Sequence, residues 1–116
     1  MEQTTVKKAA DKFIKYQLKH NSRKYAETVA VQIDEFVTSC VAQGASTLDN
    51  VNPAHIRRYL QEASGDWKNR YAMLREFFHY CIVLGWLPSP RNPMANTATA
   101  RALWAGMQTA TNRART

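Results

Sequence analysis

The chain has 116 residues, of which 45% are hydrophobic, and an excess of lysine and arginine over acidic residues gives it a formal net charge of +7. This length is enough to bury one core without disulfides or metals, and this composition excludes wholesale disorder. No apolar run reaches the length of a membrane span and no secretory signal opens the chain. We therefore expect a single cytoplasmic domain that contacts no membrane.

The positive charge indicates a polyanionic partner, and nucleic acid is the first candidate. A solvated lysine-rich surface explains the charge equally well, so the placement of the cations must decide between the two. Cys40 and Cys81 each lie in an apolar helical pattern, without a CxxC motif or a neighbouring histidine. That setting is typical of buried thiols rather than of a disulfide or a metal site, and we predict no metal and no cofactor.

The first predicted helix covers residues 5–19, with an apolar side and a lysine-rich outer side that is usually only solvated. The second runs from the N-cap Ser22 to about Gln43, and Gly44 ends it. Its predicted buried stripe consists of Tyr25, Val29, Ile33, Phe36, Val37 and Cys40. Arg23 and Lys24 stand in its first turn, where cations oppose the helix dipole. A bound phosphate would relieve that mismatch.

A third helix is predicted to start at Asn52-Pro53, with asparagine as the cap and proline at the first helical position. Before it, Leu48 and Val51 are expected to reach the core. The inward stripe of this helix consists of Ile56, Tyr59, Leu60 and Ala63, which leaves Arg57 and Arg58 outside.

The strongest periodic pattern lies between Asp66 and Leu87. Its apolar residues recur at steps of three and four and predict one buried stripe: Trp67, Tyr71, Leu74, Phe78, Cys81 and Ile82. We expect the Asp66 carboxylate to cap this helix and Gly85 to end it in a left-handed conformation. The opposite side carries Lys68, Asn69, Arg75 and His79, a surface suited to an anion.

Prolines at 88, 90 and 93 prevent helix continuation, and Trp86 and Leu87 are expected to fold back onto the bundle. A weaker helix is predicted near residues 97–109, with Leu103, Trp104 and Met107 on one side. We therefore predict an all-α fold, a compact four-helix orthogonal bundle with a short fifth C-terminal helix. Residues 1–94 form the helical domain, and residues 95–116 form a C-terminal helix and linker.

Several segments, taken in order and spacing, resemble the N-terminal core-binding (SAM-like) domain of phage integrases, the tyrosine recombinases. They are Leu48–Val51, His55–Leu60, Asn69-Arg70, Leu74–Phe78, Gly85–Leu87, Asn92-Pro93 and the tail Ala102–Met107. The resemblance covers residues 13–107 and is strongest from Thr47 to Pro93. Two departures are Trp67, where the family often has a small hydroxyl residue, and the negative charge of Asp66.

The resemblance implies a domain that grips duplex DNA at a recombination site through its second and fourth helices, while a separate C-terminal domain cleaves. It also implies a bacterial or phage-encoded protein associated with the nucleoid, with residues 95–116 leading toward a catalytic domain outside this chain. The DNA-binding candidates are then Arg23, Lys24, Thr28, Lys68, Asn69, Arg70 and Arg75. For Arg70 a second role competes, because it lies beside the apolar stripe and could pair with Glu62 or Glu76.

Two other functions, catalysis and protein interaction, compete with DNA binding. His55 and Arg58 form an H-x-x-R pattern like that of recombinase active sites, but too little chain surrounds it to build the pocket, and we predict neither catalysis nor a small-molecule substrate. The chain could instead be a protein-interaction module that docks through Leu103, Trp104 and Met107. In a multi-subunit recombinase these residues would contact a neighbouring protomer, so the two hypotheses are compatible.

Overall fold

The computed structural model describes residues 4–62, 66–88, 91–94 and 105. In this part of the chain lie α1 (Val6–His20), α2 (Arg23–Ala42), the 3-10 turn η1 (Leu48–Asn50), α3 (Pro53–Glu62) and α4 (Trp67–Val83). The described residues form no strand, only an isolated bridge between Thr5 and Thr47. The predicted all-α four-helix fold is confirmed. The predicted fifth helix lies outside the described residues except for Ala105, which is helical.

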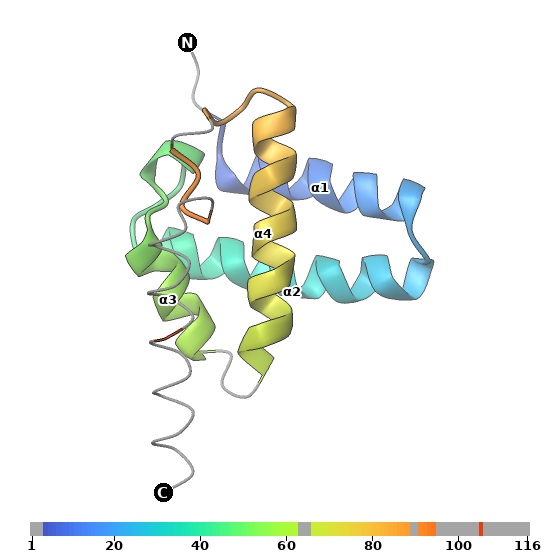
Figure 1. Cartoon of the computed structure of the whole chain (residues 1–116), viewed down its shortest axis with the longest axis horizontal. Helices are drawn as coiled ribbons and strands as arrows, with labels where there is room; N and C mark the ends of the chain where they lie inside the picture. The colour runs from blue at the N-terminus through green and yellow to red at the C-terminus, as the bar shows by residue number, and fades with distance from the viewer. Residues whose placement is uncertain (1–3, 63–65, 89–90, 95–104, 106–116) are drawn as a thin grey trace, which may run out of the picture.

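The helices form two sets that cross each other (Figure 1). α1 and α2 run antiparallel and side by side, and α4 lies across both of them. α3 packs against α2 and α4 beside them. None of the described helices has the length and apolar character that crossing a membrane requires.

Local sequence signals set most helix ends. The Ser22 Oγ accepts a hydrogen bond from the Tyr25 N–H, and the Asn52 Oδ1 accepts from the N–H groups of Ala54 and His55, so both predicted N-caps are confirmed. Gly44 and Gly85 follow α2 and α4 with φ of +82° and +80°. That left-handed conformation is nearly free only for glycine, and it confirms both predicted stops.

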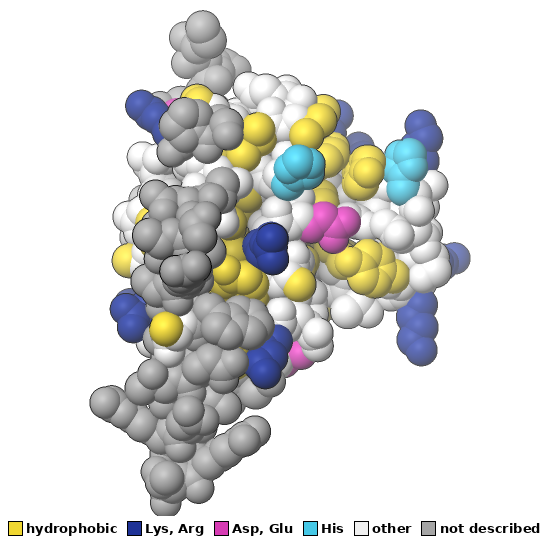
Figure 2. Space-filling model, viewed as in Figure 1, with side chains coloured by type: hydrophobic (Ala, Val, Ile, Leu, Met, Phe, Trp, Pro, Cys, Tyr) yellow, Lys and Arg dark blue, Asp and Glu magenta, His cyan; other side chains and the backbone are white. Residues whose placement is uncertain are grey.

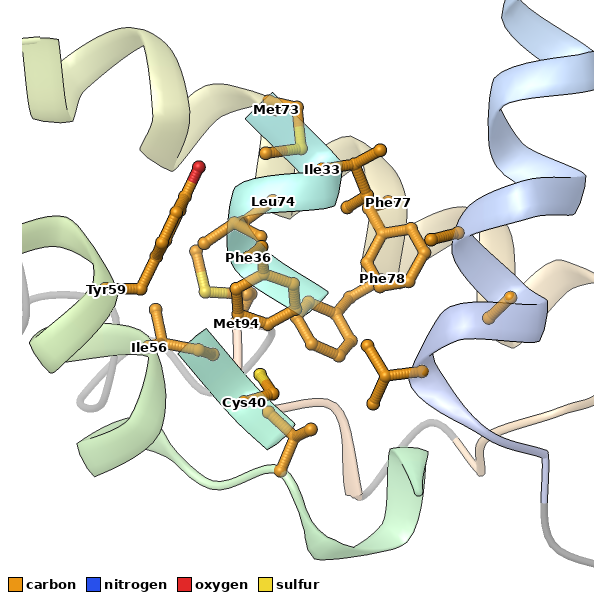
Figure 3. Packing of buried hydrophobic residues seen from close by; sticks show 14 of the residues in the cluster. Ile33, Phe36, Cys40, Ile56, Tyr59, Met73, Leu74, Phe77, Phe78 and Met94 are labelled. Carbon is orange, nitrogen blue, oxygen red and sulfur yellow. The ribbon is translucent and has the colours of Figure 1, made fainter. Parts of the chain in front are cut away.

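Aromatic rings from three helices fill the centre of the core, and Phe36 of α2 lies among them (Figure 3). Its ring meets Tyr59, Phe77 and Phe78 edge-on, with centroids 5.2, 6.2 and 6.0 Å away. Such edge-to-face pairs add roughly 0.5–1.5 kcal/mol each beyond the area they bury. The three helices therefore share one core, and none is an appendage.

The predicted buried stripes are confirmed with few exceptions, among them Val37 and Ile82, which are partly buried and pack against the core. Leu48, Val51 and Leu87 lie in the core, and both cysteines are fully buried. Burial raises the pKa of each thiol from 9.0 to about 12. The prediction for Tyr25 is wrong: the residue is 43% exposed, and its hydroxyl donates to the exposed Glu76 of α4. Ala63 lies outside the described residues.

Candidate nucleic-acid interface

The outer face of α4 is a stripe of exposed residues at steps of four, three and four: Lys68, Ala72, Arg75 and His79. These steps keep the four side chains on one side of the helix over roughly 16 Å of its axis. In Figure 2, separate cationic, histidine and acidic side chains lie over the front of the molecule among hydrophobic and uncharged surface. This stripe, called the α4 face below, is rigid because the opposite side of α4 is core.

Arg75 is the most available cation on the α4 face. It is exposed, and among the described residues its guanidinium has no ion pair or hydrogen bond. With His79 it borders a groove of about 420 Å³ between α4 and the segment 91–94. The other lining residues are Ala72, Glu76, Asn92 and Met94. The groove thus offers two donor side chains to an anion.

Glu76 ties the opening of α2 to the middle of α4. Its carboxylate accepts from the Tyr25 hydroxyl and from the Gln17 Nε2, each at 3.3 Å. Burial first, and then the charge and hydrogen bond of Glu76, raise the pKa of Tyr25. Because Tyr25 follows Lys24 and Glu76 follows Arg75, this contact joins the segments that carry two of the predicted DNA-binding residues.

Arg70 is a different kind of cation. Its side chain is only 15% exposed, and its Nη1 lies 2.5 Å from the Glu35 carboxylate and 3.2 Å from the Tyr59 hydroxyl. Its Nε lies 3.4 Å from Asp66. The acids that Arg70 meets are thus Glu35 and Asp66, and the predicted partners Glu62 and Glu76 are wrong. Its guanidinium joins α4 to α2 and α3, so geometry favours a structural role over DNA contact.

The positive charge at the start of α4 is partly neutralised by Asp66, which directly precedes the helix. The Asp66 side chain makes no capping bond to the helix, which contradicts the prediction that its carboxylate caps α4. Instead its Oδ1 accepts a 2.8 Å hydrogen bond from the Asn69 side chain. Lys68 extends over the Trp67 ring, with its Nζ 5.9 Å from the centroid. The Asn69 amide and the Arg70 guanidinium therefore take the place of the backbone N–H groups as partners of the Asp66 carboxylate.

At the opening of α2, the three candidates have unequal freedom. Arg23 pairs with Glu27 at 3.1 Å, although both side chains are well exposed. The Thr28 hydroxyl donates to the Lys24 carbonyl within the helix. Lys24 is exposed and, among the described residues, its side chain has no ion pair. Lys24 is therefore the cation of this turn that is most accessible to a phosphate.

The H-x-x-R pattern serves local structure. The Asn52 N–H donates to the Nδ1 of His55, so the imidazole helps to cap α3. Arg58 forms an exposed ion pair with Glu62, one turn further along α3, at 3.5 Å. The two side chains thus have separate partners, Asn52 just before α3 and Glu62 at its end.

Comparison of the chain with protein-family models, curated proteins and solved structures finds no match. Among the described residues, no group of three or more histidines, cysteines and carboxylates is placed to hold a metal ion. The residues Leu103, Trp104 and Met107, predicted to contact a neighbouring protomer, lie outside the described part of the chain.

Proposed function

We propose that this domain binds duplex DNA through the α4 face and the opening of α2. The observation that carries the proposal is Arg75, an exposed guanidinium on a rigid helix that has no acidic partner among the described residues. A guanidinium matches a phosphate with two parallel hydrogen bonds, and contact releases condensed counterions from the duplex.

The neighbouring residues support a backbone contact. Lys24 and Arg75 lie on segments joined by the Tyr25–Glu76 hydrogen bond, so one phosphate strand can pass both. His79 lines the groove beside Arg75 and adds an imidazole N–H that can donate to a phosphate oxygen. Most protein–DNA hydrogen bonds go to phosphate and sugar, which position a domain without reading sequence. The Asn69 amide is held by Asp66, and the proposal gives it no base contact.

The resemblance to the integrase core-binding domain supports a narrower form of this proposal. In that form, the bundle grips one side of a recombination site while a catalytic domain elsewhere in the protein cleaves the DNA. The chain by itself then binds weakly and forms no covalent adduct with DNA. Detection of a tyrosyl–DNA adduct with this chain alone would overturn that part.

The test is the salt dependence of binding, measured by fluorescence anisotropy with a labelled duplex of about two helical turns. Arg75→Gln should lower the slope of log K against log salt by about one. The matched control is Arg57→Gln, which removes one exposed cation from α3. If both variants keep the wild-type slope, or change it equally, Arg75 does not contact the duplex. Lys24→Gln tests the opening of α2 in the same way.

A further inference from the structure

The second cationic region is α1, which carries more than half of the net charge. Five of its residues are lysines and one, Asp11, is acidic, a net of +4 out of the +7 of the whole chain. Four of the lysines follow one another at steps of four, three and four: Lys8, Lys12, Lys15 and Lys19. At 100° per residue they fall within about 60° of one another around the helix and extend roughly 16 Å along it.

This α1 stripe lies opposite the core. The buried side of the helix holds Val6, Ala10 and Phe13, all at most 1% exposed, whereas all four stripe lysines are exposed. The inner side also meets α4, since the Tyr80 hydroxyl donates to the Lys12 carbonyl and the Phe13 and Tyr80 rings are 5.4 Å apart. The α1 stripe therefore points away from the bundle, whereas α4, the helix that carries the α4 face, crosses α1 on its inner side (Figure 1).

Among the described residues, Asp11 included, no carboxylate forms an ion pair with the four lysines of the α1 stripe, whereas Arg23, Arg58, Arg70 and Arg91 each pair with a carboxylate. The lysines at the start of α1 do not stabilise the helix itself either. Lys7 and Lys8 stand in the first turn with no acidic residue, where the positive end of the helix dipole disfavours them. A row of like charges at three and four residues also repels itself.

We infer that the α1 stripe is a second phosphate-binding surface, which contacts the backbone of duplex DNA on a side of the bundle that the α4 face does not reach. This inference rests on the proposed DNA-binding function and extends its footprint. Lysine binds phosphate as a point charge on a flexible stem and needs no fixed geometry, so a straight row of lysines suits a continuous line of phosphates.

An acidic protein surface is the less suitable partner. Lysine is depleted in protein–protein interfaces, which depend on buried aromatic or arginine anchors. The α1 stripe itself contains neither. Each strand of a duplex presents about one charge per 3.4 Å of the axis, so a row of about 16 Å spans roughly as many phosphates of one strand as it has lysines.

The experiment compares two charge-matched double variants with a duplex of about three helical turns, long enough for both surfaces. Lys12→Gln/Lys15→Gln removes two cations from the α1 stripe, and Arg57→Gln/Arg58→Gln removes two from α3. All four positions are exposed. The α1 variant should lower the slope of log K against log salt by about two, and the α3 variant should leave it near the wild-type value. Equal changes of the slope in both variants would mean that the effect follows the net charge of the chain and not the position of the lysines, and would overturn the inference.

Two further measurements separate this inference from the proposed function. If Arg75→Gln has no effect but the α1 variant does, the α1 stripe binds DNA and the α4 face does not. If only Arg75→Gln has an effect, the proposed function stands and this inference fails. Polyglutamate, a flexible acidic polymer, serves as competitor at the same concentration of charge as the duplex. If it displaces the duplex from the wild type but not from the α1 variant, the α1 stripe prefers acidic protein chains. That result would overturn the choice of DNA as the partner.

Discussion

Two cationic regions of this molecule differ in how their charges are paired: the opening of α4 and the outer side of α1. At the α4 opening, Arg70 is enclosed by Glu35 and Asp66, and Asp66 also holds Asn69. On α1 the lysines meet no acid among the described residues. A cation on a helix can therefore stabilise the fold through an ion pair or remain available to an external anion. The presence or absence of an acidic partner distinguishes the two roles.

The largest expected effect tests whether α4 unfolds together with α2 as one cooperative unit. Cys40 of α2 and Cys81 of α4 are buried, and the pKa of each is raised to about 12, so the nucleophilic thiolate is suppressed in the folded chain. Alkylation by iodoacetamide near neutral pH should be about 10³-fold slower, or more, in the folded chain than in urea, and equal for both thiols. Faster reaction of Cys81 would show that α4 opens separately from α2.

The same thiols give a pH dependence of definite sign. Unfolded thiols lose their protons near pH 9.0, whereas the folded ones keep them until about 12. Between these values the folded state binds more protons, so the free energy of unfolding contributed by these thiols falls as pH rises. The contribution is fully present below pH 9. Cys40→Ala/Cys81→Ala provides the control, because its stability should lose less across this window.

The next effect concerns Arg70. Arg70→Gln should lower the free energy of unfolding by roughly 1–3 kcal/mol, because it leaves Glu35 and the Tyr59 hydroxyl without their cation. Lys15→Gln, on the α1 stripe, should change it by less than about 0.5 kcal/mol. Urea denaturation measures both. If the two variants had the same free energy of unfolding, Arg70 would be no more structural than Lys15, and it would again be a candidate for DNA contact.

The smallest effect concerns Lys15, which has Lys12 and Lys19 one turn away on either side and Asp11 four residues before it. Lys15→Glu replaces two repulsions with attractions but turns the attraction to Asp11 into a repulsion, so the fold should gain at most about 0.5 kcal/mol at low salt. Added salt should screen that gain, and the same variant should bind duplex DNA more weakly. Thermal unfolding at two salt concentrations measures the first effect. A destabilised variant would mean that Lys15 has a stabilising partner, contrary to the inferred role.

The helices, their caps and most of the core could be predicted from the sequence because they depend on local periodicity. Ser22, Asn52, Gly44 and Gly85 act through bonds and dihedral angles within a few residues of themselves. The stripe of α4 was readable because every third or fourth residue is apolar. The element boundaries therefore followed from the chain itself.

The exceptions depend on contacts between distant residues. Glu35 lies 35 residues before its partner Arg70, and Tyr25 lies 51 residues before Glu76, so no local pattern announces either pair. Asp66 failed as a cap because the neighbouring Asn69 and Arg70 side chains compete for its oxygens. For the candidate site, sequence supplied the outward positions on α2 and α4. It could not show which of those cations were already occupied.

The fully buried Gln17 has a consequence for the geometry of the whole surface. Its amide donates to Glu76 of α4 and accepts from Asn21 at the end of α1, so both of its polar ends are used inside the bundle. Asn21 moves with α1, so the bond to Glu76 is the one that joins the two helices. Rotation of α1 about its axis would break that bond and leave a buried amide N–H without an acceptor, so Gln17 opposes such rotation and helps to fix the angle between the two cationic surfaces.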